Sequence, residues 1–144
     1  MQIIGFNFTK MSAEKLTQFK RANITNDVRF INIEKEQLDL LTKEAEAVRI
    51  SFSYALRYED PEKKETKTGE VSFEGNLILS MTKEELKQTM KTWKKKQVPS
   101  FLQMPLLNTI LHKCTPKAAY LQDEISLPSH LPVPRVALKP EQQD

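Results

Sequence analysis

The stretch AVRISFSYALRYEDPEKKETKTGEVSFEGNLILS, residues 47–80, alternates apolar and polar side chains in two runs that a charged loop separates. The first run has an apolar residue at every second position from Val48 to Tyr58, and the second repeats the pattern from Val71 to Leu79. Because successive strand side chains point to opposite faces, each run predicts a strand with one apolar and one solvated face. The stretch therefore predicts a β-hairpin, which is stable only when another layer covers its apolar face.

The sequence before this hairpin predicts further strands. Apolar and polar residues alternate from Ile4 to Thr9, which indicates a first short strand. The charged segment Ser12–Arg21 fits either a short surface helix or a segment that crosses the fold, and Asn23–Asp27 has the composition of a turn. The β-branched and aromatic residues of Val28–Ile33 predict a second strand. Glu34–Glu46 fits either a continuation of that strand followed by a loop or a single helical turn.

The sequence directly after the hairpin predicts a helix. Thr82-Lys83-Glu84-Glu85 is a capping-box pattern, in which the threonine oxygen and the last glutamate each accept a backbone N–H at the helix start. Helical spacing then places one apolar stripe toward the core, formed by Leu86, Met90 and Trp93. The helix is expected to end before Val98-Pro99, because the residue before a proline avoids helical angles.

A second helix is predicted from Pro105 to Lys113, since proline is favoured at the first helical position and the segment has a broad apolar face. We expect this helix to be the main cover of the sheet. Thr115-Pro116 has the pattern of another N-cap and first position, so a separate short helix is expected to run to about Glu124. Leu127–Pro134 is rich in proline and is predicted to be extended or turned.

Length and composition indicate one ordinary globular domain. The chain has 144 residues, of which 39% are hydrophobic and 28% are charged, with a formal net charge of +3. A chain of this length buries enough surface to form its own core. We expect residues 1–138 to form that domain and residues 139–144 to be a flexible tail. The predicted class is α+β, with a four-stranded antiparallel β-sheet packed on one face by C-terminal helices.

The single cysteine, Cys114, excludes an intramolecular disulfide and a cysteine-rich zinc site. A reducing, cytoplasmic setting is therefore expected. The first residues lack the basic start and continuous apolar segment of a signal peptide, and no stretch approaches the length of a membrane span. Membrane insertion is not expected.

No group of residues points to catalysis or to a metal. His112 and His130 are far apart in sequence and lack nearby carboxylates, and Cys114 lies on the apolar face of the predicted second helix. A buried thiol in such a place behaves as a small hydrophobic group. The few glycines form no phosphate-binding loop. We expect a protein that is not an enzyme and that uses no metal or cofactor.

Three kinds of surface remain to be compared. An apolar surface left uncovered by the helices would bind other proteins. The lysines of the segment Lys91–Lys96 could instead contact phosphate, with Trp93 stacked on a base, which makes a nucleic-acid-binding module the second hypothesis. Because Trp93 also lies on the apolar stripe of the first helix, packing in the core is its simpler interpretation. The third hypothesis is a structural subunit whose apolar surface serves only assembly.

Element order and several local stretches resemble the SecB family of bacterial export chaperones. FNFTKMSAE (residues 6–14) is similar to the end of its first strand and the start of its crossover segment, and VRFINIEKEQL (residues 28–38) is similar to its second strand. EAVRISFSYALRYE (residues 46–59) and GEVSFEGNLILSM (residues 69–81) are similar to its third and fourth strands. VPSFLQMPLLNTIL (residues 98–111) is similar to the entry of its main helix, and the proline-rich ending resembles uncharacterised archaeal relatives of that chaperone.

The resemblance implies an ATP-independent holdase that binds unfolded or non-native polypeptides in apolar grooves for protein export, as a homodimer or homotetramer. By position in the family, the residues that would line such a groove are Phe8, Met11, Phe19, Phe101, Leu102, Leu131 and Val133. SecB proteins are acidic and dock an export motor on an acidic sheet surface. Because this chain is basic, motor docking is not expected to carry over.

Overall fold

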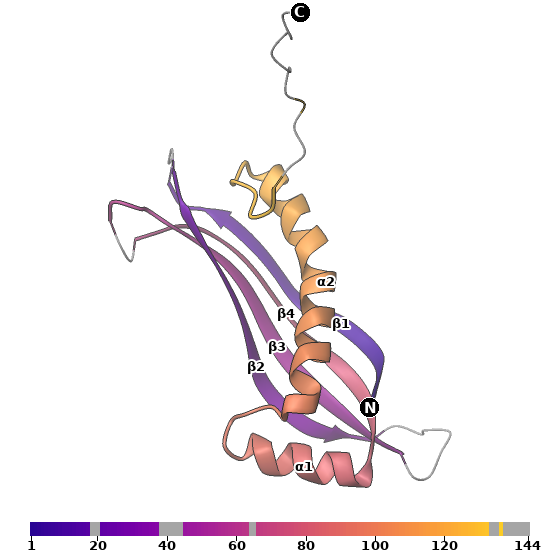
Figure 1. The fold of residues 1–144 in the computed structure, drawn as a ribbon. Helices are drawn as coiled ribbons and strands as arrows, with labels where there is room; N and C mark the ends of the chain where they lie inside the picture. Colours follow the sequence, from indigo (N-terminus) through magenta and orange to yellow (C-terminus); the bar gives the residue numbers. More distant parts are fainter. Residues whose placement is uncertain (18–20, 38–44, 64–65, 133–135, 137–144) are drawn as a thin grey trace, which may run out of the picture.

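The computed structural model describes residues 1–17, 21–37, 45–63, 66–132 and 136, and it shows one sheet with two helices (Figure 1). The strands are β1 (Gln2–Lys15), β2 (Asn23–Glu36), β3 (Ala45–Glu59) and β4 (Lys67–Thr82). The helices that follow are α1 (Lys83–Trp93) and α2 (Ser100–Glu124). The predicted class, a four-stranded antiparallel sheet with C-terminal helices on one face, is confirmed.

The predicted hairpin forms the centre of the sheet. The strand order is β1-β4-β3-β2, and all neighbouring strands are antiparallel. The apolar residues at every second position of β3, from Val48 to Tyr58, are fully buried, as are Val71, Phe73, Leu77 and Leu79 of β4. The opposite face is solvated and carries ion pairs, such as the one between Arg49 and Glu36 at 3.1 Å. The strands with the strictest alternation are therefore the central ones.

Both edge strands contain bulges. The register of β1 with β4 shifts at Ile4 and again at Thr9, and the register of β2 with β3 shifts at Ile31. A bulged residue leaves the regular pairing and turns outward, and Ile4 and Ile31 are 44% and 51% exposed. Bulges on an edge make simple sheet extension harder without removing the free backbone groups of that edge.

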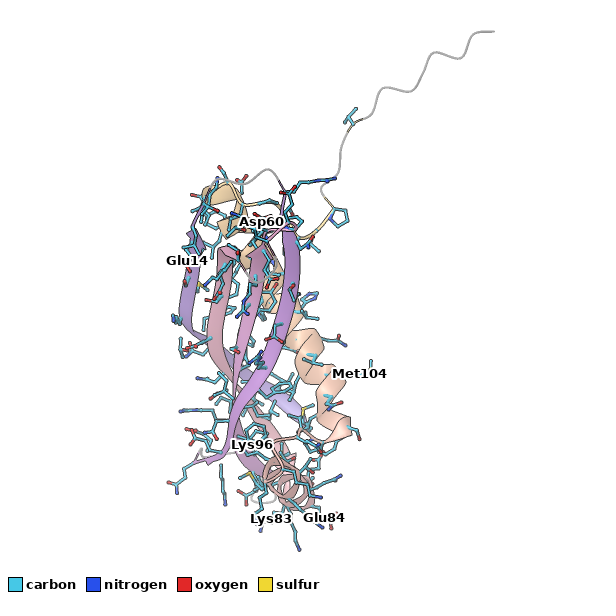
Figure 2. All side chains as sticks on the ribbon, turned by 90° about the vertical axis from the view of Figure 1, so that its left-hand side faces the viewer. Glu14, Asp60, Lys83, Glu84, Lys96 and Met104 are labelled. Atoms are coloured by element: carbon cyan, nitrogen blue, oxygen red, sulfur yellow. The ribbon has the colours of Figure 1, made fainter. Side chains whose placement is uncertain are left out.

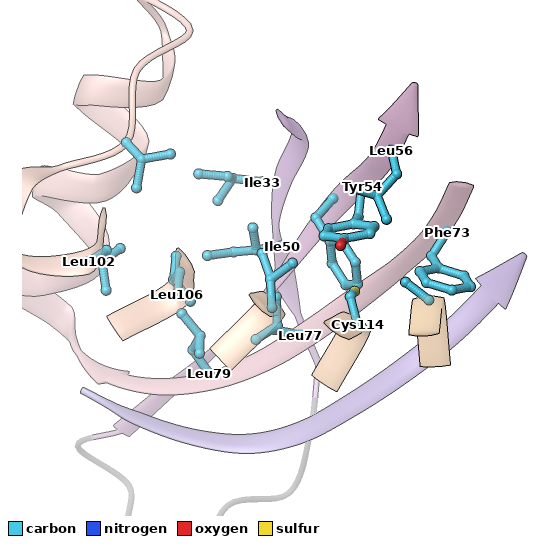
Figure 3. Packing of buried hydrophobic residues seen from close by; sticks show 14 of the residues in the cluster. Ile33, Ile50, Tyr54, Leu56, Phe73, Leu77, Leu79, Leu102, Leu106 and Cys114 are labelled. Carbon is cyan, nitrogen blue, oxygen red and sulfur yellow. The ribbon is translucent and has the colours of Figure 1, made fainter. Parts of the chain in front are cut away.

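Helix α2 lies along the inner face of the sheet and buries one residue per turn against it (Figure 1). These residues are Leu102, Leu106, Ile110, Cys114 and Ala118, all without solvent exposure. Figure 3 shows Leu106 and Cys114 facing Ile50, Leu77 and Tyr54 of the sheet. Burial of apolar side chains on this scale, at about 2 kcal/mol each, is the main source of stability.

Helix α1 begins as predicted. Thr82 Oγ1 accepts the backbone N–H of Glu85 at 3.1 Å, and Glu85 Oε1 accepts the backbone N–H of Thr82 at 3.0 Å. The expected stripe also faces the core, with Leu86 and Met90 packed at its border and Trp93 only 8% exposed. The helix closes one end of the sheet, at the end opposite the C-terminal segment (Figure 1).

Two predicted breaks in secondary structure are wrong. Asn23–Asp27, expected as a turn, belongs to β2. These residues do not favour a strand by themselves, but their backbone hydrogen bonds to β3 hold them in one. Pro105 and Pro116, expected to start two helices, both lie inside α2. Each proline removes one backbone hydrogen bond and costs about 3 kcal/mol in a helix interior. The side chains that α2 buries against the sheet outweigh that cost.

The structure decides between the alternatives for part of Ser12–Arg21 and part of Glu34–Glu46. Ser12–Lys15 continues β1, which excludes a surface helix over those residues, and Glu34–Glu36 continues β2 as one of the two alternatives stated. Residues 18–20 and 38–44 lie outside the described residues, as do residues 139–144 of the expected tail. Within the described chain, neither helix combines the length and apolarity that a membrane span requires.

Candidate functional site

The described residues among those nominated for an apolar groove do not share one surface. Phe8 and Met11 lie on β1 with their side chains on the helix side of the sheet, since they pair with Gly75 and Phe73. Phe8 is half-buried and Met11 is 48% exposed. At other places, Phe101 is half-buried in the first turn of α2, and Leu131 is 44% exposed beyond its end.

Leu102 is a correction to the expected groove. Its side chain is fully buried and belongs to the core between α2 and the sheet. Helical spacing is the reason, because Leu102 precedes Leu106 by four residues and both face the same layer. Phe19 and Val133 lie outside the described residues, so their place in a groove stays a prediction.

Aromatic, apolar and cationic side chains gather where β1 runs beside α2. The ammonium of Lys113 lies 6.0 Å from the centroid of the Phe6 ring, and the ammonium of Lys117 lies 5.6 Å from that of Phe8. These cation–π contacts hold the lysine side chains across the space between helix and strand. We call this surface the β1–α2 flank, which consists of Phe6, Phe8 and Met11 of β1 and of Lys113, Lys117 and Tyr120 of α2.

The flank leaves two large side chains open to solvent. Met11 is 48% exposed and Tyr120 is 64% exposed. Tyr120 follows Lys117 by three residues and lies between the buried Ala118 and Gln122, so it projects from the outer side of α2, about one turn beyond Lys117. The flank as defined includes Phe8 and Met11, which the sequence nominated, and adds Tyr120, which it did not.

The aromatic rings of the flank are anchored in the core. The rings of Phe6 and Phe8 lie 5.0 Å apart, and each also packs on a core ring, with Phe6 5.3 Å from Phe52 and Phe8 5.6 Å from Phe73. Packing of this kind restricts the rings to fixed positions. The aromatic part of the flank is therefore rigid, and it lies at the free edge of the sheet.

A concave surface lies at the other sheet edge, beside α1. It is a cavity of about 620 Å³ between β2, the loop that joins the two helices, and the start of α2. Arg29 and Phe30 of β2 line one side, and Gln103 of α2 lines another. The remaining lining residues are Trp93, Lys96, Gln97 and Val98. We call it the β2–loop pocket; the sequence does not predict it, because nothing in the pattern places β2 beside this loop.

Lys96 and Trp93 contact each other at the start of that loop. Trp93 is 8% exposed, and Lys96 Nζ lies 5.0 Å from its ring centroid, so the ring is unavailable for stacking on a base. The simpler interpretation of Trp93 as a core residue is confirmed. Lys96 has a φ of 57°, in the left-handed region where glycine is usual, and this conformation costs about 1–2 kcal/mol for other residues.

The end of the sheet opposite α1 carries a polar cluster that holds the C-terminal segment. Gln122, which is 1% exposed, donates its amide to the hydroxyl of Tyr58 at 2.5 Å, and that hydroxyl donates to the carbonyl of Pro128 at 2.6 Å. His130 Nδ1 lies 3.1 Å from Gln122 Oε1, and burial lowers the pKa of His130. This cluster fixes the chain beyond α2 and has the composition of a structural latch.

Cys114 and His112, two side chains with catalytic potential, lie on opposite sides of α2, with Cys114 buried and His112 exposed. Burial raises the pKa of the Cys114 thiol to about 12, so the thiol stays protonated and weakly reactive. His112 is exposed beside a shallow apolar depression lined by Leu111 and Pro116. In the part of the chain that the structure describes, no three His, Cys, Asp or Glu side chains meet as a metal site.

Comparison with known proteins gives one kind of likeness. No protein-family model matches the chain, and a search of curated proteins finds no match. Among solved structures, the chain is similar to the Mycobacterium tuberculosis Rv1957 SecB-like chaperone, in complex with a ChAD peptide from the Rv1956 HigA1 antitoxin. The two are 18% identical, the match covers 97% of this chain and 92% of that one, and the TM-score is 0.47.

Proposed function

We propose that the chain is an ATP-independent holdase that binds non-native polypeptides on the β1–α2 flank. The observation that carries the proposal is the exposed Met11 beside a rigid aromatic base at a free sheet edge, with the exposed Tyr120 on the adjoining helix. Non-native polypeptides differ from folded proteins in exposing apolar side chains and unpaired backbone groups. The flank offers partners for both.

Apolar burial would supply the affinity. Met11 and Tyr120 each retain about half or more of their surface in solvent, so a client that covers them contributes roughly 1 kcal/mol at each. The lysine stems of Lys113 and Lys117 add apolar surface beside the rings while their charged ends stay in water. Contacts of this type are weak one by one and tolerate many sequences, which suits a holdase.

The free edge of β1 would supply the second interaction. β1 pairs only with β4, and its other side has no strand partner in the described fold. An extended client segment can donate and accept backbone hydrogen bonds along such an edge whatever its side chains. The bulges at Ile4 and Thr9 interrupt regular pairing and keep any added strand short.

We also propose that the protein acts as a homodimer or homotetramer. Several copies would place several flanks in one particle, so that one client chain is held at more than one point. Binding at linked sites raises the overall affinity well above that of a single site. The same flank could instead be covered by another copy, in which case the chain is a structural subunit.

Aggregation of a chemically unfolded client, followed by light scattering without nucleotide, tests the proposal. We expect the protein to suppress scattering at near-stoichiometric amounts. A Met11→Lys, Tyr120→Lys double variant is expected to need several times more protein for the same effect, because it places charges where apolar contacts form. Met104→Lys is the matched control, since Met104 is 71% exposed on α2 and lies outside the flank (Figure 2).

Three outcomes would contradict the proposal. If the wild-type protein leaves aggregation unchanged, holdase activity is absent. If the double variant acts as well as the wild type, clients bind elsewhere. If the double variant turns an oligomer into monomers, as measured by light-scattering mass, the flank is an interface between copies and the structural-subunit hypothesis is favoured.

A further inference from the structure

The β2–loop pocket has an apolar floor and a polar rim. Trp93 and Val98 are 8% and 7% exposed, and together with the half-buried Phe30 they form the floor. The rim residues are all exposed and consist of Arg29, Lys96, Gln97 and Gln103. A volume of about 620 Å³ accommodates one or two side chains of a larger ligand. The ligand must therefore carry an apolar group and a polar group close together.

The charge of the rim selects the polar group. Among the described residues, two cations and no acidic side chain line the pocket. Arg29 is paired with Asp27 at 2.6 Å, whereas no ion pair to Lys96 occurs within the described ranges. Lys94 and Lys95 are exposed beside Lys96 in the same turn. A carboxylate is the complement of such a rim, and the two glutamine amides add donors for its oxygens.

The backbone beside the pocket is the free edge of the sheet. β2 pairs only with β3, and Arg29 and Phe30 come directly before the bulge at Ile31. Along an extended segment lying on this edge, alternate side chains would point toward the helix side, where Phe30 and the pocket floor lie. A ligand of this shape is a stretch of polypeptide, not a free small molecule.

We propose that the β2–loop pocket binds an extended polypeptide segment in which an acidic residue lies next to an aromatic or large aliphatic one. The apolar side chain covers Phe30 and Val98, and the carboxylate accepts hydrogen bonds from Lys96 and from the rim amides. The inference rests on the proposed function and adds to it a preference for acidic clients that the β1–α2 flank does not provide.

The test compares two labelled peptides, both acetylated and amidated so that their ends carry no charge. One alternates phenylalanine with glutamate, and the other has glutamine in place of each glutamate. Fluorescence anisotropy is expected to show about tenfold tighter binding of the glutamate peptide, the effect of one charge-assisted contact. The difference is expected to shrink as salt rises from about 0.05 M to about 0.5 M, because salt screens exposed charges.

Lys96→Gly assigns the preference to the pocket without harming the fold. Glycine adopts the φ of 57° that Lys96 holds, so the variant is expected to unfold at the same or a higher temperature. It is expected to lose most of the preference for glutamate while binding the glutamine peptide as before. Ser126→Gly is the matched control, because Ser126 has the same φ of 57° at the other end of α2, and it is expected to keep the preference.

Several results would overturn the assignment. They are equal binding of the two peptides, an unchanged preference in Lys96→Gly, or tighter Lys96-dependent binding of a single-stranded oligonucleotide than of the glutamate peptide. Failure here is distinct from failure of the holdase proposal. If the protein suppresses aggregation of a client but does not discriminate between the peptides, the proposal of holdase activity is kept and the proposal of a preference for acidic segments is rejected. If it discriminates between the peptides but does not suppress aggregation, the holdase proposal falls.

Discussion

The hydroxyl of Tyr58, at the end of β3, donates a 2.6 Å hydrogen bond to the carbonyl of Pro128, beyond the end of α2. The same hydroxyl accepts the amide of the buried Gln122. One side chain thus joins the central strand to the segment in which Leu131 is exposed. The position of that segment depends on this buried polar contact as well as on the packing of Leu127 beside Gly69.

Tyr58→Phe tests the contribution of that contact to stability. The variant keeps the ring but leaves the amide of Gln122 and the carbonyl of Pro128 without the hydroxyl, so we expect the free energy of unfolding to fall by about 1–3 kcal/mol. Urea denaturation followed by circular dichroism measures the change. Tyr120→Phe is the control and is expected to change it by less than about 0.5 kcal/mol, because Tyr120 is exposed. Equal effects of the two variants would contradict the role given to Tyr58.

The latch is expected to weaken in acid. Burial lowers the pKa of His130 below its ordinary value of 6.5, so the folded state favours the neutral ring that lies against Gln122. The unfolded or released state binds a proton more readily, and the stability of the latch therefore falls as the pH drops below 6.5. We expect the Leu127 amide, which donates to the Gln122 carbonyl at 2.8 Å, to lose exchange protection between about pH 7.5 and about pH 5.5.

Hydrogen exchange must be corrected for its intrinsic pH dependence before the comparison. The His130→Gln variant supplies the control, since its side chain does not titrate in this range. Corrected protection that stays constant in the wild type, or that falls equally in the variant, would remove His130 as the cause.

Cys114 is expected to be unreactive in the folded protein. Its thiol is buried and its pKa is raised to about 12, so both access and the thiolate fraction are low. Iodoacetamide labelling read by mass spectrometry should modify Cys114 only after denaturation. Ser129→Cys adds an exposed thiol to the same chain as an internal positive control. Rapid labelling of Cys114 under native conditions would show that α2 separates from the sheet.

Gly75 is expected to tolerate no larger residue. It pairs with Phe8 of β1 and Phe52 of β3, and a Cβ atom there would overlap the carbonyl of Asn7 and lie 3.0 Å from the ring of Phe52. Gly75→Ala should lower the stability by about 1–3 kcal/mol, the usual cost of overpacking. Gly5→Ala is the matched control, because a Cβ there lies 3.4 Å from Ile78, an ordinary contact. Similar urea midpoints for both variants would contradict the packing described.

The sequence predicts the central sheet well because two independent patterns agree there. Alternation assigns the large apolar side chains at every second position from Val48 to Tyr58 to the buried face, and the charged loop fixes where the hairpin turns. The capping box at Thr82 likewise marks the helix start in the residues themselves. Asn23–Asp27 and Pro116 were misjudged because local preference opposes the observed structure, and packing against distant residues decides the outcome.

The candidate surfaces were only partly predictable for a related reason. Phe8 and Met11 are three residues apart, so regular alternation would place them on opposite faces, and only the bulge at Thr9 brings both to the helix side. Lys113, Lys117 and Tyr120 follow one another along α2 only if the helix continues through Pro116. The break predicted at Pro116 would place Lys113 in one helix and Lys117 and Tyr120 in another. The β2–loop pocket depends on a contact between elements about sixty residues apart, which only the sheet order reveals.

The most direct test of the central claim is the mass of the protein mixed with a permanently unfolded client, measured by size-exclusion chromatography with light scattering and without nucleotide. We expect one species with the mass of a homodimer or homotetramer plus a bound client, and loss of that species in the Met11→Lys, Tyr120→Lys variant. Separate elution of protein and client at concentrations of about 10 μM would contradict the account, since contacts of a few kcal/mol at several linked flanks give complexes that persist there.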